Sequence, residues 1–172
     1  LVPLGALTWE HSHQYVNAET LYRTTIARNP GAWMALHNLG EMKVRGSEED
    51  LQEALGYIRE SLRIYADNAE AHNSLGFALR RLGQPDEARR EFDTALRLNP
   101  RLSAAHNNLG VLAHGEGRQA EAMEHYREAS RLNPADPEPL RNLGLILLDQ
   151  GDVADAARHF EAAYARDPDS PD

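Results

Sequence analysis

Small and large apolar residues alternate at helical spacing and return at a constant step along this chain of 172 residues. A small residue is followed four positions later by a large one and, three positions after that, by another small one. The four occurrences are Ala54, Ile58 and Ser61; Ala88, Phe92 and Ala95; Ala122, Tyr126 and Ala129; and Ala156, Phe160 and Ala163. Residues four and seven positions apart share one face of an α-helix. The pattern therefore predicts four amphipathic helices of one kind, each 34 residues after the last.

A leucine followed by a glycine marks a second helix in every period. The tripeptides are Asn38-Leu39-Gly40, Ser74-Leu75-Gly76, Asn108-Leu109-Gly110 and Asn142-Leu143-Gly144. The last three lie 34 residues apart, whereas the first interval is 36 residues, and the excess falls in residues 46–50, where a turn can absorb it. Each period is thus expected to be a pair of helices, A and B.

Glycines and prolines mark where these helices begin and end. Gly83, Gly117 and Gly151 lie between the two helices of a pair, where glycine supplies the C-cap conformation. Pro85 falls just inside a B helix, where its missing N–H costs nothing. B helices are expected to end at Asn29-Pro30, Asn99-Pro100, Asn133-Pro134 and Asp167-Pro168, with Tyr65-Ala66 in the place of a fifth such pair.

One hairpin of two helices cannot bury its apolar face alone, so neighbouring hairpins must stack. The small residues are expected to let helices approach closely, and the large ones to fill the space between units. The predicted units are residues 33–68, 69–102, 103–136 and 137–168, preceded by a half repeat at 1–32 with a B helix over 15–28, and followed by a tail at 169–172. The predicted fold is all-α.

Together these positions resemble the tetratricopeptide repeat, whose pattern has Leu-Gly at positions seven and eight, Ala at twenty, an aromatic at twenty-four, Ala at twenty-seven and Pro at thirty-two. Four units fit when counted from Trp33, Ala69, Ser103 and Pro137. The resemblance implies a right-handed superhelical solenoid of antiparallel helix pairs whose A helices line the concave face. It also implies a scaffold that binds a protein or an extended peptide segment.

The A-helix positions that would line this face give the candidate peptide-binding residues: His37, Asn38, Asn73, Ser74, Phe77, Asn107, Asn108, Val111, Arg141, Asn142 and Leu145. Asparagine predominates at positions five and six, and an amide can both donate to and accept from a peptide backbone. The repeat domain of O-GlcNAc transferase, which this ladder resembles, uses asparagines in that way. Asparagine at position six is, however, common in the family whatever is bound. Phe77, Val111 and Leu145 would either contact ligand or pack between adjacent A helices.

Two further ligand classes can be weighed from the same positions. The clamp that some family members use for the C-terminal carboxylates of chaperones needs lysines that are absent here, so that class is rejected. Arg45, Arg80 and Arg81 cluster near the ends of A helices. They would either recognise an acidic partner segment or simply interact with the helix C-terminal dipole.

Composition narrows the function further. There is no cysteine, and the formal net charge of −9 argues against nucleic acid as a partner.

The histidines do not predict a metal site. His72 and His106 share one repeat position, and His125 and His159 another, so each pair is expected to lie one repeat apart and form no metal site. His11-Ser12-His13 is a weak metal signal. No nucleophile elbow or phosphate loop is found. The chain is therefore expected to be a non-catalytic scaffold without cofactors.

The N-terminal stretch is similar to a junction in membrane O-mannosyltransferases that carry C-terminal tetratricopeptide repeats. In that interpretation residues 1–9 are the stub of a membrane helix, the repeats lie outside the cytoplasm, and they present acceptor proteins to a glycosyltransferase. The sequence alone leaves the compartment open, and residues 1–9 are too few to insert into a membrane. The other alternative is self-assembly, in which the uncapped end bearing Phe160 and Tyr164, or the N-terminal half repeat, stacks on a second copy.

Overall fold

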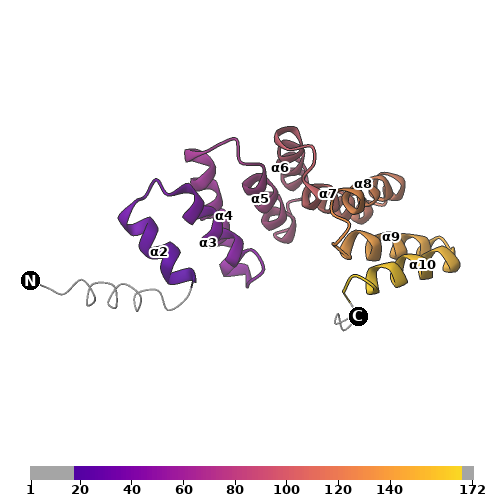
Figure 1. Cartoon of the computed structure of the whole chain (residues 1–172). Helices are drawn as coiled ribbons and strands as arrows, with labels where there is room; N and C mark the ends of the chain where they lie inside the picture. The colour runs from indigo at the N-terminus through magenta and orange to yellow at the C-terminus, as the bar shows by residue number, and fades with distance from the viewer. Residues whose placement is uncertain (1–17, 168–172) are drawn as a thin grey trace, which may run out of the picture.

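The computed structural model describes residues 18–167, and within them it forms nine α-helices and no strand. They are α2 (Ala18–Arg28), α3 (Trp33–Lys43), α4 (Glu48–Ile64), α5 (Ala69–Arg81), α6 (Pro85–Leu98), α7 (Ser103–Gly115), α8 (Gln119–Leu132), α9 (Glu138–Asp149) and α10 (Val153–Tyr164). Consecutive helices pair as antiparallel hairpins that stack into an extended curved array (Figure 1). The all-α helical repeat predicted from the sequence is confirmed.

The helix boundaries follow the residues that predicted them. The A helices α3, α5 and α7 begin at Trp33, Ala69 and Ser103, the first residues of the predicted units. Pro85 is at the start of α6, and Asn99 is its C-cap residue. The turn glycines Gly83, Gly117 and Gly151 have φ angles of 72°, 77° and 82°, a left-handed conformation that favours glycine.

The first hairpin departs from the others at its turn. The helix α4 has 17 residues, against 14 in α6, and it begins at Glu48. Ser47 and Asp50 form a capping box at this start, with the Asp50 backbone N–H donating to the Ser47 side chain over 3.2 Å. The extra residues therefore lengthen the start of a helix as well as the turn, which corrects the expectation that a turn alone would absorb them.

Tyr65 replaces the asparagine that ends later B helices. It is the C-cap residue of α4 and has an extended backbone, like Asn99 after α6. Its ring lies 4.8 Å, centroid to centroid, from the ring of Trp33 at the start of α3. One turn earlier, the hydroxyl of Ser61 donates to the Trp33 carbonyl over 2.9 Å. These contacts explain how a serine is buried at a position where the other units have alanine.

The large residue of each B helix packs inside its own hairpin, against the glycine of the A helix. A Cβ added to Gly76 would lie 2.6 Å from Cε1 of Phe92, and one added to Gly110 would lie 2.5 Å from Cε1 of Tyr126. Gly40 and Gly144 meet Ile58 and Phe160 in the same way. Each of these large residues therefore packs within its own hairpin, where an aromatic ring requires a glycine opposite it.

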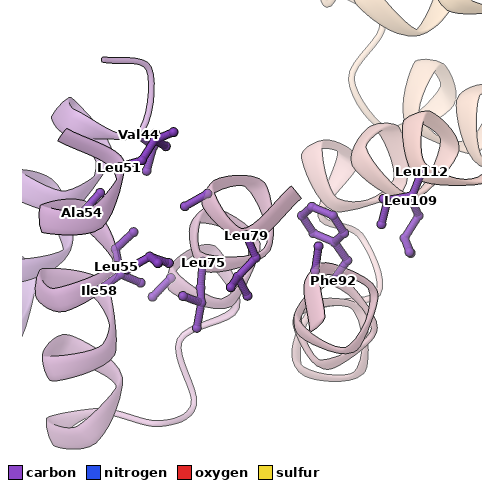
Figure 2. Packing of buried hydrophobic residues seen from close by; sticks show 13 residues of the cluster. Val44, Leu51, Ala54, Leu55, Ile58, Leu75, Leu79, Phe92, Leu109 and Leu112 are labelled. Atoms are coloured by element: carbon purple, nitrogen blue, oxygen red, sulfur yellow. The ribbon is translucent and has the colours of Figure 1, made fainter. Parts of the chain in front are cut away.

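These rings also connect one hairpin to the next. Phe92 belongs to a single buried cluster that runs from Leu51 and Leu55 in α4 through Leu75 in α5 to Leu109 in α7 (Figure 2). A core that continues from one hairpin to the next is what stacking repeats requires. Some predictions fall outside the described residues: the start of the B helix at 15–17, the histidines at 11 and 13, the stretch 1–9 and the tail at 169–172.

Candidate functional site

A groove of about 640 Å³ crosses the A helices of all four hairpins. Its lining comprises Glu41, Val44, Arg45, Asn73, Ser74, Phe77, Arg80, Ala104, Asn107, Asn108, Val111, Asp136, Glu138 and Asn142. Seven of these are predicted peptide-binding residues, and Arg45 and Arg80 belong to the predicted arginine cluster. Asp136 lies in the loop before α9, and no helical pattern could have found it.

The asparagines at positions five and six form hydrogen bonds across successive units. The amide nitrogen Nδ2 of Asn108 donates to Oδ1 of Asn73 over 2.9 Å, and Nδ2 of Asn142 donates to Oδ1 of Asn107 over 3.1 Å. Asn108 is buried, while the other three are partly exposed. Each bond uses the side-chain oxygen of the earlier asparagine and the side-chain nitrogen of the later one. Within residues 18–167, it leaves Nδ2 of Asn73 and Asn107 without a protein partner.

Different residues form the hydrogen bonds at the first seam, the contact between the A helices α3 and α5 of the first two hairpins. The hydroxyl of Ser74 donates to Oε1 of Glu41 over 2.5 Å, and Nε2 of His37 lies 3.4 Å from the same hydroxyl oxygen. Burial lowers the pKa of His37, although the carboxylates of Glu41 and Glu70 act in the opposite direction. A neutral imidazole therefore lies at this seam at neutral pH, and the groove changes chemistry from α3 to α5.

Arg80 is the one half-buried cation of the groove among the described residues. Its guanidinium carbon lies 5.2 Å from the centre of the Phe77 ring. Burial and the nearby charge of Arg81 lower its pKa, so its charged form is less stable here than in water. Its Nε is buried and has no hydrogen-bond partner.

The other two arginines of the predicted cluster have separate environments. One Nη of Arg81 donates to the carbonyls of Val44 and Gly46, over 2.8 Å and 3.2 Å, and so ties α5 to the turn of the first hairpin. Arg45 is exposed at the edge of the groove. The cluster therefore divides into a structural residue, a rim residue and one cation inside the groove.

Four predicted site residues lie outside the groove lining. His37 forms the first seam, and Arg141 forms ion pairs with Glu138 at 3.5 Å and Asp167 at 3.7 Å. Leu145 is 47% exposed on α9. Asn38 lines a separate shallow pocket of about 470 Å³ between α2 and α3, together with Trp33. The groove thus gathers the other seven: Asn73, Ser74, Phe77, Asn107, Asn108, Val111 and Asn142.

Two histidine contacts within hairpins were missed by comparing repeat positions alone. Nδ1 of His72 lies 2.6 Å from Oε2 of Glu91, and Nδ1 of His106 lies 3.2 Å from Nδ1 of His125. The first residue of each pair is on an A helix and the second on the following B helix, 19 residues later. That spacing was the available signal. In the described part of the chain, no three His, Cys, Asp or Glu side chains gather closely enough to hold a metal ion.

Across residues 18–167, none of the helices combines the length and the apolar character needed to cross a bilayer. What these residues form is a stack of two-helix repeats with a continuous groove on its A-helix side, the architecture of a repeat scaffold.

The tetratricopeptide repeat family model matches residues 12–69, 73–137 and 125–171. The chain belongs to this family, whose members are in general non-catalytic scaffolds. A search of curated protein sequences finds no match. The resemblance to O-mannosyltransferases therefore stays a prediction.

Several solved structures share the fold. PilF of Pseudomonas aeruginosa is 22% identical with a TM-score of 0.75, covering 95% of this chain and 72% of its own. MamA is 20% identical with a TM-score of 0.69, covering 86% of this chain and 85% of its own. YrrB, a TPR protein with an unusual peptide-binding site, is 22% identical with a TM-score of 0.62, covering 88% and 77%. At these identities the likeness concerns the fold alone.

Proposed function

We propose that this chain is a non-catalytic module that binds an extended segment of another protein along the groove of its A helices. The observation that supports this proposal most is the row of unpaired amide nitrogens on Asn73 and Asn107. Each is held in place because its own oxygen already accepts from the next unit. An extended backbone offers a carbonyl to such donors whatever its sequence. YrrB, a structure of similar fold, is described by its peptide-binding site, which agrees with this use.

The hydrogen bonds along the ladder determine how it should be tested. Replacing Asn108 or Asn142 with alanine would remove a bond between units as well as a ligand contact. The change to aspartate at Asn73 and Asn107 is cleaner, because each carboxylate keeps the oxygen that its neighbour donates to and loses only the free Nδ2 donor. It also places negative charges where a backbone carbonyl would approach.

We expect the double variant N73D/N107D to bind groove ligands at least about tenfold more weakly than the wild type, because two donors are lost and two carbonyls are repelled. The measurement is retention of peptides from a random bead library, followed by fluorescence polarisation with a retained peptide. The matched control is Gln52→Glu, which adds a carboxylate on an exposed position of α4 away from the groove. Equal binding by the wild type and N73D/N107D would contradict the proposal.

A second candidate function, self-assembly, is favoured by apolar side chains exposed on the last hairpin. Leu148 on α9 and Val153 and Tyr164 on α10 are 47%, 62% and 61% exposed. Burying them against another copy would stabilise a dimer through the hydrophobic effect. Light scattering over a range of concentrations separates the two functions, since a strict monomer eliminates self-assembly and leaves peptide binding unaffected.

The presentation of acceptor proteins to a membrane glycosyltransferase is a further proposal. It rests only on the sequence of the N-terminal junction.

A further inference from the structure

Within residues 18–167, Arg80 is the one arginine with a buried guanidinium nitrogen that makes no hydrogen bond. Arg89 in α6 pairs with Glu116 at 3.0 Å and Glu121 at 3.1 Å, and Arg141 in α9 pairs with two carboxylates. Arg80 lies deeper than a surface side chain, yet no described residue supplies a carboxylate to it, and its buried Nε makes no hydrogen bond. A partly buried and unpaired charge is costly for a folded protein.

The surroundings of this guanidinium fix which part of it a ligand can reach. The Phe77 ring lies under the guanidinium carbon, and Nε is enclosed by protein. Arg80 lines the groove, and its Nη groups are not among the buried unpaired atoms. They are therefore the donors that a ligand can contact. Two parallel N–H groups of an arginine match the two oxygens of a carboxylate, and such a pair is stronger than a neutral hydrogen bond.

We propose that Arg80 anchors a single carboxylate of the extended segment that occupies the groove. This inference rests on the proposed function and adds the chemical class of the partner. The ligand is a peptide with one Asp or Glu opposite Arg80 and uncharged residues opposite Asn73 and Asn107. An ion pair with this carboxylate would give Arg80 the counter-ion that no described residue supplies.

The rest of the groove explains why one carboxylate is favoured over an acidic tract. Glu41, Asp136 and Glu138 also line the groove, and the chain as a whole carries a formal charge of −9. A ligand with several negative charges would be repelled at these positions and at long range. Arg45, at the exposed rim, is screened by solvent and contributes less than Arg80.

The first experiment is selection from a bead library of random peptides with amidated C-termini, carried out with the whole chain. The wild type is expected to retain peptides that share one Asp or Glu flanked by uncharged residues, and Arg80→Gln is expected to lose that preference. A retained peptide is then measured by fluorescence polarisation beside its Glu→Gln or Asp→Gln counterpart. Each single change should weaken binding about tenfold, while the double change should add nothing further, because both remove the same pair.

Two variants serve as controls. Arg45→Gln removes an exposed groove arginine, and it should weaken the acidic peptide by less than about twofold and leave the neutral peptide unchanged. Arg80→Lys keeps the charge but loses the two parallel donors, so it should weaken only the acidic peptide, by an intermediate factor. Far-ultraviolet circular dichroism checks that each variant keeps its helices. If Arg80→Gln does not fold, Arg80→Lys carries the comparison.

The outcomes separate the two proposals. If the wild type retains no peptide, the proposed function fails. If it retains peptides that N73D/N107D releases, but without a shared carboxylate, the groove is a binding site and the role of Arg80 is wrong. The same conclusion follows if the preference for a carboxylate survives Arg80→Gln, or if Arg80→Lys weakens the acidic and neutral peptides alike.

Discussion

The hairpins α5–α6 and α7–α8 share one helical pattern but place different pairs of side chains at the same two positions, His72 with Glu91 in the first and His106 with His125 in the second. Nε2 of His72 lies 3.0 Å from the Ala66 carbonyl, and Nε2 of His106 lies 3.2 Å from the Pro100 carbonyl, so in both hairpins this nitrogen donates to the backbone. The Nδ1 nitrogen then faces the B helix, where one hairpin has a glutamate and the other a histidine.

The facing residue decides which form of the imidazole is stable. The hydrogen bond to Glu91 raises the pKa of His72 against the opposing effect of burial, which favours the charged imidazolium. In the next hairpin, burial and the neighbouring His106 both lower the pKa of His125, which favours the neutral form. The repeat thus fixes one hydrogen bond to the backbone, while a single B-helix residue decides whether the A-helix imidazole faces a carboxylate or a second imidazole.

The strongest test concerns what the two hairpins share. Gly76→Ala and Gly110→Ala should each lower the free energy of unfolding by about 1–3 kcal/mol, because the added Cβ would overlap the ring of Phe92 or Tyr126. Gly76→Ala should cost more, since its Cβ would also lie 3.0 Å from the Ala88 carbonyl oxygen, which moves less easily than a ring edge. Urea unfolding followed by circular dichroism measures both.

Gly56→Ala is the matched control for these substitutions. Gly56 lies in the middle of α4, and a Cβ there would meet nothing within 4 Å. The same substitution should therefore stabilise the protein by up to about 1 kcal/mol through helix propensity. A loss of stability at Gly56 equal to that at Gly110 would show that glycine is needed for a reason other than the ring contact.

The second test exchanges the B-helix residues that face the two A-helix histidines. A histidine whose folded pKa is lowered stabilises the fold above its unfolded pKa, near 6.5, and that stability is lost as the pH falls through the folded pKa. This is the case of His125. His72 has a raised pKa, so its contribution is present below about 6.5 and is lost as the pH rises through the folded value.

His125→Glu should therefore reduce the loss of stability between about pH 7.5 and pH 5.5, and Glu91→His should increase it, each by roughly 0.5–1 kcal/mol because both sites are partly exposed. Other charges face His125, namely Glu121, Asp93 and Arg89, so each variant is compared with the wild type at every pH. Urea midpoints supply the measurement. Parallel pH profiles for the two variants would refute the opposite pKa shifts of His72 and His125.

The contrast also marks what the sequence could and could not predict. The period of apolar residues predicted the helices and the face that carries Asn73 and Asn107, while the turn glycines and Asn-Pro pairs predicted where helices end, because these features depend on local spacing. The same spacing did not predict which side chains form hydrogen bonds between successive hairpins. Whether Asn108 bonds a ligand or Asn73 depends on the offset between stacked units, which no local pattern encodes.

Arg80 shows that the same limit applies to the pairing of charges. The sequence predicted its place in a cluster near the end of an A helix, yet only the packed structure shows that no carboxylate in residues 18–167 pairs with it. The sequence contains abundant acidic residues that could have paired with it. Helix geometry therefore predicts which residues share a face, whereas charge pairing depends on distances of a few ångströms between separate helices.

The smallest expected effect concerns the two seams that flank α7–α8. Arg89 in α6 reaches Glu116 and Glu121 of the next hairpin, and the corresponding residue 34 positions later, Met123, packs against an apolar cluster instead. Arg89→Met would give the first seam the chemistry of the second. We expect the unfolding free energy in moderate salt to change by less than about 0.5 kcal/mol, since partly exposed ion pairs contribute little.

The dependence of the unfolding free energy on salt should change more clearly, because the ion pairs that salt screens would be gone. Urea unfolding at low and high sodium chloride tests this, with Arg90→Met on the exposed side of α6 as the control. If Arg89→Met keeps the salt dependence of the wild type, these ion pairs do not join the two hairpins in solution.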